Sequence, residues 1–255
     1  MAKGRSPTRE RETGLKVLTG VRVTQSVLDR LHTLHDHFVR GVRNGRKLVL
    51  RRCDLSGLNF TRMNLRGAEL LACSFREAEL SLTGFRLARL FAADFEGANL
   101  TGADFEKADL RGAVFQHANL TGARFEGADL RDCALIDEET NEVGEAVPST
   151  FRAAVLRDTK MASSKLKNAT FNVAIMENTD FSNADLRAAC FQGAEFIKAN
   201  LSAARLADAD LRGAAFTQTD LSVVDLNQSI MASVRGVSEE WLREVLQAHA
   251  EWVKS

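Results

Sequence analysis

Large apolar residues recur at every fifth position along most of this chain. In steps of five, all 18 positions from Leu50 to Leu135 are Leu or Phe, and all 17 from Phe151 to Met231 are Leu, Phe or Met. The position two residues before each of these centres is small: Ala, Cys, Ser or Thr fills 15 of the first 18 sites and 16 of the next 17. Asp or Asn often lies between the two, so the unit reads A-(D/N)-(L/F)-x-x.

A period of five fits neither an α-helix nor a flat strand, because both would scatter these apolar residues around all sides. The chain must instead turn every five residues, so that successive units form the sides of a coil and coils stack roughly 4.8 Å apart as parallel strands. From Phe75 to Phe125 the centres alternate strictly between Phe and Leu. Four units per coil stack like on like, whereas three would mix the two, so the pattern predicts a four-sided coil.

These units resemble those of the pentapeptide-repeat family, over about Leu48 to Ser233. The resemblance implies an all-β fold, a right-handed quadrilateral parallel β-helix, for which we also expect capping α-helices at both ends. In this family the C-terminal end often mediates dimerisation. The family's best-known activity belongs to quinolone-resistance proteins of the Qnr type, which bind DNA gyrase through a rod resembling duplex DNA, and some of which carry loops that interrupt the coil.

The series breaks between Leu135 and Phe151, where the spacing of sixteen residues is not a multiple of five. Residues 136–145 carry five acids and no base, a composition typical of a solvated loop. We therefore expect a first β-helix segment at 48–135, an acidic loop at 136–150 and a second, coaxial segment at 151–233. The preferred register places Phe151 in the Phe125 column and Leu166 in the Leu120 column, with one degenerate unit near Val143 or Ala146.

The two flanks are predicted to cover the open ends of the stack, because uncovered strand edges invite aggregation. After a disordered basic tail at 1–14, residues 15–47 form a helical cap: Thr24 begins a helix that runs to about Val42, with Val27, Leu31, Leu34 and Phe38 in its apolar stripe. Residues 234–255 form a C-terminal capping or dimerisation helix. Its apolar side holds Trp241, Leu242, Val245, Leu246 and Trp252.

Composition narrows the class of protein. The 255 residues hold 34 basic and 34 acidic side chains, four cysteines without a Cys-x-x-Cys pair, and neither a membrane-length apolar run nor a secretory signal. We expect a cytoplasmic protein without disulfides, and the zero net charge weighs against one that coats nucleic acid. The charge is nevertheless polarised, since residues 1–47 hold eleven bases and four acids.

Candidate chemistry is sparse. His32, His35 and His37 beside Asp36 could hold a metal, but zincin spacing is absent, and histidines at the margin of a capping helix are the plainer interpretation. His249 is expected to pack within the last helix. Cys53, Cys73 and Cys133 occupy the small inward slot, Cys190 precedes a centre, and no nucleotide-binding or nucleophile motif is present. We expect no enzyme activity, cofactor or metal.

The outer faces are therefore the candidate sites. One face is expected to hold Asp54, Glu77, Asp94, Glu96 and Asp137 against Arg76 alone, a modest acidic patch near the loop. Phe91 is expected to point outward, either as a contact residue extended by Leu82 and Leu87 or partly covered by Leu71 or Arg111. The candidate partner-binding residues are Phe91, Asp94, Glu96, Asp137, Glu138, Glu139, Glu142 and Glu145. A basic patch, either a solvated cap or a phosphate-binding cluster, comprises Arg40, Arg43, Arg46, Lys47, Arg51 and Arg52.

These features predict a non-catalytic scaffold that presents a rigid rod to another protein, with a homodimer through the C-terminal end. Neither a membrane nor, in the plainer interpretation, nucleic acid is the partner. The alternative is a gyrase-binding protein that protects against quinolones by partial DNA mimicry, which requires an acidic stripe to occupy a basic groove.

Overall fold

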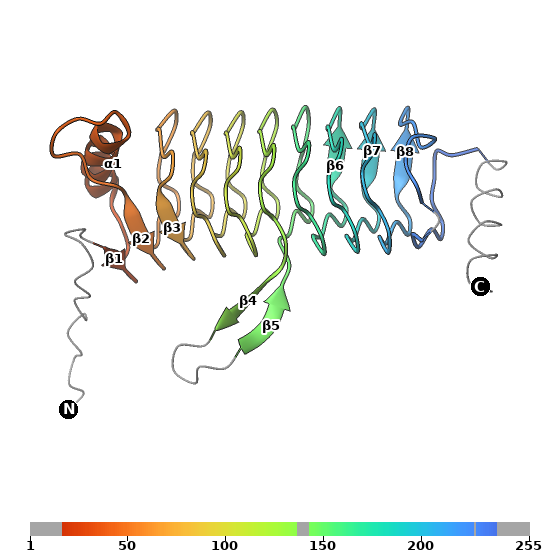
Figure 1. Ribbon diagram of the computed structural model, residues 1–255, viewed down its shortest axis with the longest axis horizontal. Helices are drawn as coiled ribbons and strands as arrows, with labels where there is room; N and C mark the ends of the chain where they lie inside the picture. Colours follow the sequence, from red (N-terminus) through yellow and green to blue (C-terminus); the bar gives the residue numbers. More distant parts are fainter. Residues whose placement is uncertain (1–16, 137–142, 227, 239–255) are drawn as a thin grey trace.

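The computed structural model describes residues 17–136, 143–226 and 228–238 of the protein, which form a long rod of stacked coils (Figure 1). A helix lies across the N-terminal end of the rod, and a two-stranded hairpin projects from its middle. The elements are β1 (Leu18–Thr19), α1 (Gln25–Val39), β2 (Val49–Arg51), β3 (Glu69–Leu71), β4 (Cys133–Ile136), β5 (Val143–Val147), β6 (Ile175–Glu177), β7 (Glu195–Ile197) and β8 (Ala215–Thr217).

Each coil is built from four five-residue units that pair in parallel with the coil twenty residues later. The bridges Asp54↔Ser74 and Asn59↔Glu79 begin two of the four sides, and equivalent bridges run along the stack. We name the faces by their first centres within the coil: face A starts at Leu55, face B at Phe60, face C at Leu65 and face D at Leu50. The four-sided coil predicted from the alternation of Phe and Leu is confirmed.

The core consists of the centres and the small residues before them. Centres from Leu50 to Leu130 and from Phe151 to Met231 are at most 8 % exposed. Like side chains stack in columns: the Phe85 and Phe105 rings lie 4.9 Å apart at 5°, and the Phe105 and Phe125 rings 4.7 Å apart at 14°. The inside of the rod is therefore filled by its own side chains.

The Asp or Asn before a centre helps to form the corner that follows the centre. At Asp94 the carboxylate Oδ1 accepts the Glu96 N–H at 3.0 Å, and Asn99 Oδ1 accepts the Thr101 N–H at 3.2 Å. Asp and Asn favour such local bonds to the backbone two residues on. The corner residue itself takes a positive φ, as at Gly102 (66°). The sequence unit thus encodes one side and one corner.

The stack continues across the interruption in a register that differs from the predicted one. Val114 pairs with Thr150, 36 residues on, and Arg124 pairs with Lys160. Phe151 therefore follows Phe115, not Phe125, and the expected continuation of the Leu120 column into Leu166 is wrong as well, because Asp129 pairs with Lys165. The hairpin takes sixteen residues out of the coil as an antiparallel pair, so no degenerate unit is needed. Leu135, expected to be an inward centre, belongs to β4 instead.

The N-terminal end is closed by a cap that consists of β1 and α1. β1 pairs in parallel with β2 through Leu18↔Leu50, and Arg22 bridges to Asp54, so the chain supplies part of an extra coil before the helix begins. Helix α1 follows Thr24, whose side chain makes no capping bond, and ends at Val39 instead of the expected Val42.

Of the predicted apolar stripe on α1, Leu31 packs against the core, but the other three residues are exposed. Leu28 and His35 are buried, whereas Val27 and Leu34 are each 38 % exposed and Phe38 is 47 % exposed. The reason is that the first coil has no preceding coil to accept its backbone N–H groups. Gln25 Oε1 accepts the Asn59 N–H at 3.0 Å, and the polar side of the helix is turned inward to supply further acceptors.

At the other end, residues 228–238 complete the last described coil, where Ala215 bridges to Arg235. No helix forms in residues 234–238, the described part of the predicted C-terminal helix. The rest of that predicted helix, residues 239–255, lies outside the described residues. So does the whole predicted basic tail at 1–14.

Candidate interaction surface

The hairpin leaves the rod at the corner between faces D and A. Its strands pair in antiparallel fashion through Cys133↔Val147 and Ala134↔Ala146, with an irregularity before Ile136↔Val143. Ser149 Oγ donates to the Leu110 carbonyl at 3.0 Å, which ties the returning chain to the coil beneath. In Figure 1 β4 and β5 project away from the stack and lean toward its N-terminal end. The hairpin can therefore meet a partner without any change in the coils.

Of the acids predicted for the loop, Glu145 lies exposed on β5. Asp137, Glu138, Glu139 and Glu142 lie outside the described residues. The described part of the hairpin thus carries one of the five loop acids.

The acidic patch predicted on face A is partly neutralised. A single guanidinium, that of Arg76, pairs with Asp94 at 2.9 Å and with Glu96 at 2.5 Å. Asp54 faces Arg22 at 3.6 Å. These contacts lie at the surface and contribute little to stability, but they offset the negative charge that a basic partner would need.

Phe91, the outward aromatic residue, is half-buried. The guanidinium carbon of Arg111 lies 5.6 Å from the centre of its ring, a cation–π geometry. Arg111 is held in place by two bonds of 2.8 Å to the Asp109 carboxylate, and this pairing raises the pKa of Arg111 above its usual range. Leu82 and Leu87 are exposed at the corners of two other faces of the same coil, so the three side chains do not form one patch.

The six basic residues of the N-terminal patch do not form one free cluster. Arg40 pairs with Asp36 at 3.0 Å, and Lys47 pairs with Glu69 at 2.7 Å. Arg51 and Arg52 also have partners of their own. Arg43 and Arg46 are exposed without an ion pair in the described part of the chain. The patch therefore offers two free cations where six were counted.

The histidines of α1 have a structural task that the sequence analysis missed. His35 Nδ1 accepts the Leu48 N–H at 3.1 Å, and His32 Nε2 accepts the Asn64 N–H at 3.3 Å. Burial, assisted by the neighbouring His32 ring, lowers the pKa of His35 from 6.5 to about 4, and burial also lowers the pKa of His32. Both rings act as neutral acceptors that close the first coil. The sequence signal for this role is that Gln25, His32 and His35 lie on one side of the helix.

Among the described residues no group of His, Cys, Asp and Glu could hold a metal ion.

Three of the cysteines are buried as expected, and Cys190 is half-exposed. Cys53 and Cys73 lie on successive coils, where the adjacent Cys73 thiol lowers the pKa of Cys53, and the Cys53 thiol together with burial raises the pKa of Cys73. Both side chains are 1 % exposed, so neither thiol is open to a substrate. Cys133 lies at the root of the hairpin and not in the coil interior.

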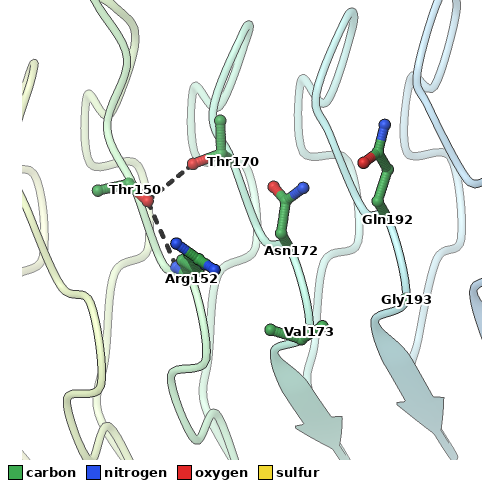
Figure 2. A pocket seen from close by; sticks show the side chains of 7 residues that line it. All are labelled: Thr150, Arg152, Thr170, Asn172, Val173, Gln192 and Gly193. Atoms are coloured by element: carbon green, nitrogen blue, oxygen red, sulfur yellow. Dashed lines mark hydrogen bonds between the residues drawn. The ribbon is translucent and has the colours of Figure 1, made fainter.

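A shallow, open depression of about 560 Å³ lies on face A, just after the hairpin root (Figure 2). Thr170 donates to Thr150 across its edge at 2.8 Å, and Arg152 is its one charged lining group. It is lined by Thr150, Arg152, Thr170, Asn172, Val173, Gln192 and Gly193. The lining is polar and free of acids, unlike the opposite half of the same face near Asp94.

No curated protein matches the chain. Among solved structures, QnrB1, a plasmid-mediated fluoroquinolone resistance protein, is 18% identical with a TM-score of 0.49, and the match covers 91% of this chain and 95% of that one. HetL from the cyanobacterium Nostoc sp. PCC 7120, a pentapeptide-repeat protein involved in heterocyst differentiation, is 23% identical with a TM-score of 0.38, over 78% and 92% of the two chains. Both TM-scores are below 0.5, so neither likeness carries weight for the fold or the role of this chain.

A bilayer-crossing helix is not found in the part of the chain that the structure describes.

The family model for pentapeptide repeats matches eight copies, at residues 49–81, 93–132, 164–202 and 194–231, which together exceed half of the chain. With the four-sided stack and its buried Leu and Phe columns, this match shows that the chain is a right-handed β-helix that belongs to the pentapeptide-repeat family.

Proposed function

We propose that this protein is a non-catalytic interaction scaffold, and that the β4–β5 hairpin together with the neighbouring depression on face A binds a macromolecular partner. The observation that carries the proposal is the hairpin itself. Between residues 48 and 226 it is the one described element that departs from the stack, and it leaves the Phe columns on either side unbroken. An element that contributes nothing to the core yet occupies sixteen residues fits a contact role.

The arrangement of the two parts supports a joint surface. β5 ends at Val147, and the depression begins three residues later at Thr150. Glu145 on β5 thus precedes the hairpin root, and Arg152 follows it. A partner that meets both would carry basic groups for the hairpin and an acidic or hydrogen-bonding group for the depression.

The absence of enzyme activity is part of the same proposal. The interior of the coil is filled by side chains, and the outer faces of the described residues offer a shallow depression in place of an enclosed cleft. The depression also lacks an acid, a histidine or a cysteine, since its lining consists of hydroxyl and amide side chains, one arginine, Val173 and Gly193.

DNA gyrase is the second candidate partner, because an acidic loop interrupting the coil is similar in kind to the loops of Qnr-type proteins. The charge of the rod gives this candidate limited support. Arg76 pairs with Asp94 and Glu96. Arg131 pairs with Asp129, and Arg187 pairs with Asp185. Within the residues that the structure describes, no face carries the continuous acidic stripe that mimicry of duplex DNA needs.

Two variants test whether the hairpin and the depression bind a partner. A variant without residues 133–148 restores the ordinary twenty-residue spacing, and Arg152→Glu reverses the charge of the depression. Partners captured by the full chain from its own cells, then purified and recombined with it, should lose at least tenfold in affinity with either variant. Retention of every purified partner by both variants would overturn the proposal.

The gyrase candidate is checked with purified components. Supercoiling by gyrase is measured with and without a quinolone, in the presence of the full chain or of the variant without residues 133–148. Protection by the full chain that the deletion abolishes favours gyrase. Absence of any effect at tens of micromolar protein removes gyrase and leaves the scaffold proposal to the binding assay.

A further inference from the structure

Exposed apolar side chains are concentrated at the N-terminal end of the rod. Of the eleven exposed large hydrophobic residues in the described part of the chain, five lie between Val21 and Val42. Three of them, Val27, Leu34 and Phe38, form one row on helix α1, which we call the α1 stripe. At about 100° per residue the three positions fall within roughly 40° of one another. Such a row on a short helix marks a contact surface more often than a solvated one.

The charge beside the stripe is basic. Arg30 and His37 follow Val27 by three and ten residues, which places both along one border of the row. Asp29 and Asp36 lie on the far side of the helix. Arg30 also has no ion pair within residues 17–136, 143–226 and 228–238, and neither do Arg43 and Arg46 nearby.

In the rest of the rod, most of the described arginines have an acidic partner. Arg86 pairs with Glu106, Arg111 with Asp109, and Arg157 with Glu177. The N-terminal end thus combines apolar area with unpaired positive charge, and its occupant must be apolar and acidic. A second copy of the same end is excluded, since it would set arginine against arginine. Residues 1–16 are excluded on the same ground, with five bases and two acids.

The chain itself contains a segment with the required character. Residues 239–255 hold four acids and two bases, and their sequence predicts an amphipathic helix. Trp241, Val245, Ala248 and Trp252 have the same spacing as Val27, Leu31, Leu34 and Phe38. Glu244 and Glu251 follow Trp241 by three and ten residues, the offsets at which Arg30 and His37 follow Val27. The two rows match in length, and the acid Glu244 stands at the offset where the stripe has the base Arg30.

This segment cannot reach the stripe of its own chain as a helix. The stack from β1 to the last coil has nine steps of about 4.8 Å, roughly 40 Å in all, whereas 17 helical residues span about 25 Å. A second apolar row, which includes Leu242, Leu246 and Val253, is free to cover the segment's own last coil. We propose that the α1 stripe is a docking surface for residues 239–255 of a second copy of this chain.

The proposal predicts a contact between two different surfaces, so two single-sided variants must complement each other. One variant, Leu34→Glu with Phe38→Glu, loses the stripe but keeps the C-terminal segment. The other ends at Ser238 and keeps the stripe. In sedimentation velocity the full chain should associate beyond its 28.0 kDa mass as concentration rises. Each variant alone should remain a monomer, and an equimolar mixture should form a species of twice that mass.

Controls exclude loss of folding. Leu82→Glu alters an equally exposed leucine away from the stripe and should associate as the full chain does. Far-ultraviolet circular dichroism of each variant should match the full chain. Both tryptophans of the protein lie in residues 239–255, so their emission should shift to shorter wavelength in the mixture but not in the stripe variant alone.

Four outcomes would overturn the proposal. A full chain that stays monomeric at 100 micromolar removes the contact. A stripe variant that still dimerises shows instead a two-fold contact between C-terminal ends, and a truncated chain that still associates shows contact between N-terminal ends. A monomeric full chain whose stripe is needed to bind vesicles of anionic lipid would assign the surface to a membrane.

Discussion

The ring of Phe151 stacks on the ring of Phe115, with centroids 4.9 Å apart and planes 7° from parallel. The two residues are 36 positions apart in the sequence, and the hairpin lies between them. Their contact is as close as that of Phe95 and Phe115 within the uninterrupted coils, at 5.0 Å and 5°. The column therefore passes the hairpin without a defect, and the hairpin is an addition to the fold that no core contact requires.

Removal of residues 133–148 should leave the fold and its stability nearly unchanged. The deletion joins Asp132 to Ser149, which already occupies the small inward slot before Phe151. Closing a shorter connection costs slightly less conformational entropy, so the thermal midpoint should stay within about 3 °C of the full chain. Circular dichroism during heating gives the midpoint.

A matched deletion of the same length tests the register argument. Removal of residues 174–189 also takes out sixteen residues, but from within the stack, where sixteen is not a multiple of the unit. Every later centre would then meet the wrong side of the coil. This second variant should lose its cooperative transition. A similar midpoint for both deletions would contradict the account of the interruption.

The five-residue pattern was sufficient to predict the coil, because burial at every fifth residue and like-on-like stacking leave one solution. It could not place Phe151, since Phe115 and Phe125 offer equal ring contacts to it. The choice depends on the hairpin, whose backbone pairs with itself through Cys133 and Val147, outside any repeat. The expectation that Phe151 continues the Phe125 column therefore failed at the one place where pairing is local.

The candidate site was less accessible to sequence reasoning. Helix α1 has an apolar row, which would be expected to face the core, but the first coil needs hydrogen-bond acceptors more than it needs apolar cover. His32, His35 and Gln25 meet that need, and the row remains outside. Phe91 was correctly placed near Arg111, because residues twenty apart on one face must stack.

Gly112 should be intolerant of a side chain because of the hairpin root. Its φ is +66°, and an added Cβ would overlap the thiol of Cys133. Gly122 is the matched control: its φ is +68°, and its nearest neighbours are atoms of Gly102 at 4.0 Å. Both Gly→Ala substitutions strain the backbone by about 1 kcal/mol, but Gly112→Ala should cost a further 1–3 kcal/mol from overpacking.

Urea unfolding of the two variants measures the difference. The double variant Gly112→Ala with Cys133→Ala removes the overlapping sulfur and should recover most of the additional loss. Equal unfolding free energies for Gly112→Ala and Gly122→Ala would show that Cys133 moves to accommodate the added methyl group without loss of stability.

The N-terminal cap should weaken in acid through His35. The pKa of His35 is 6.5 in the unfolded chain and about 4 in the cap. Between these two pH values the unfolded chain therefore binds a proton at His35, whereas the folded chain does not. Stability is complete above pH 6.5 and falls as the pH drops to about 4, with no further loss from this group below that. The total change is about 3 kcal/mol.

Hydrogen exchange at the Leu48 amide between pH 7 and pH 4 reports this loss, after correction for the intrinsic rate. His35→Asn keeps an acceptor but removes the titration, so its protection should vary less across the same range. His117→Asn, at an exposed corner far from the cap, should behave as the full chain. A protection factor at Leu48 that is independent of pH would refute the capping role of His35.

Phe105 should be among the most costly residues to truncate. Its ring is fully buried between Phe85 at 4.9 Å and Phe125 at 4.7 Å, and it also meets Phe95 and Phe115 edge to face. Phe105→Ala leaves a cavity that the rigid coils above and below cannot close, so the unfolding free energy should fall by about 3–5 kcal/mol in urea. Leu87→Ala, at an exposed corner one coil away, should cost less than about 1 kcal/mol. A loss below 1 kcal/mol at Phe105 would mean that the Phe column does not support the rod.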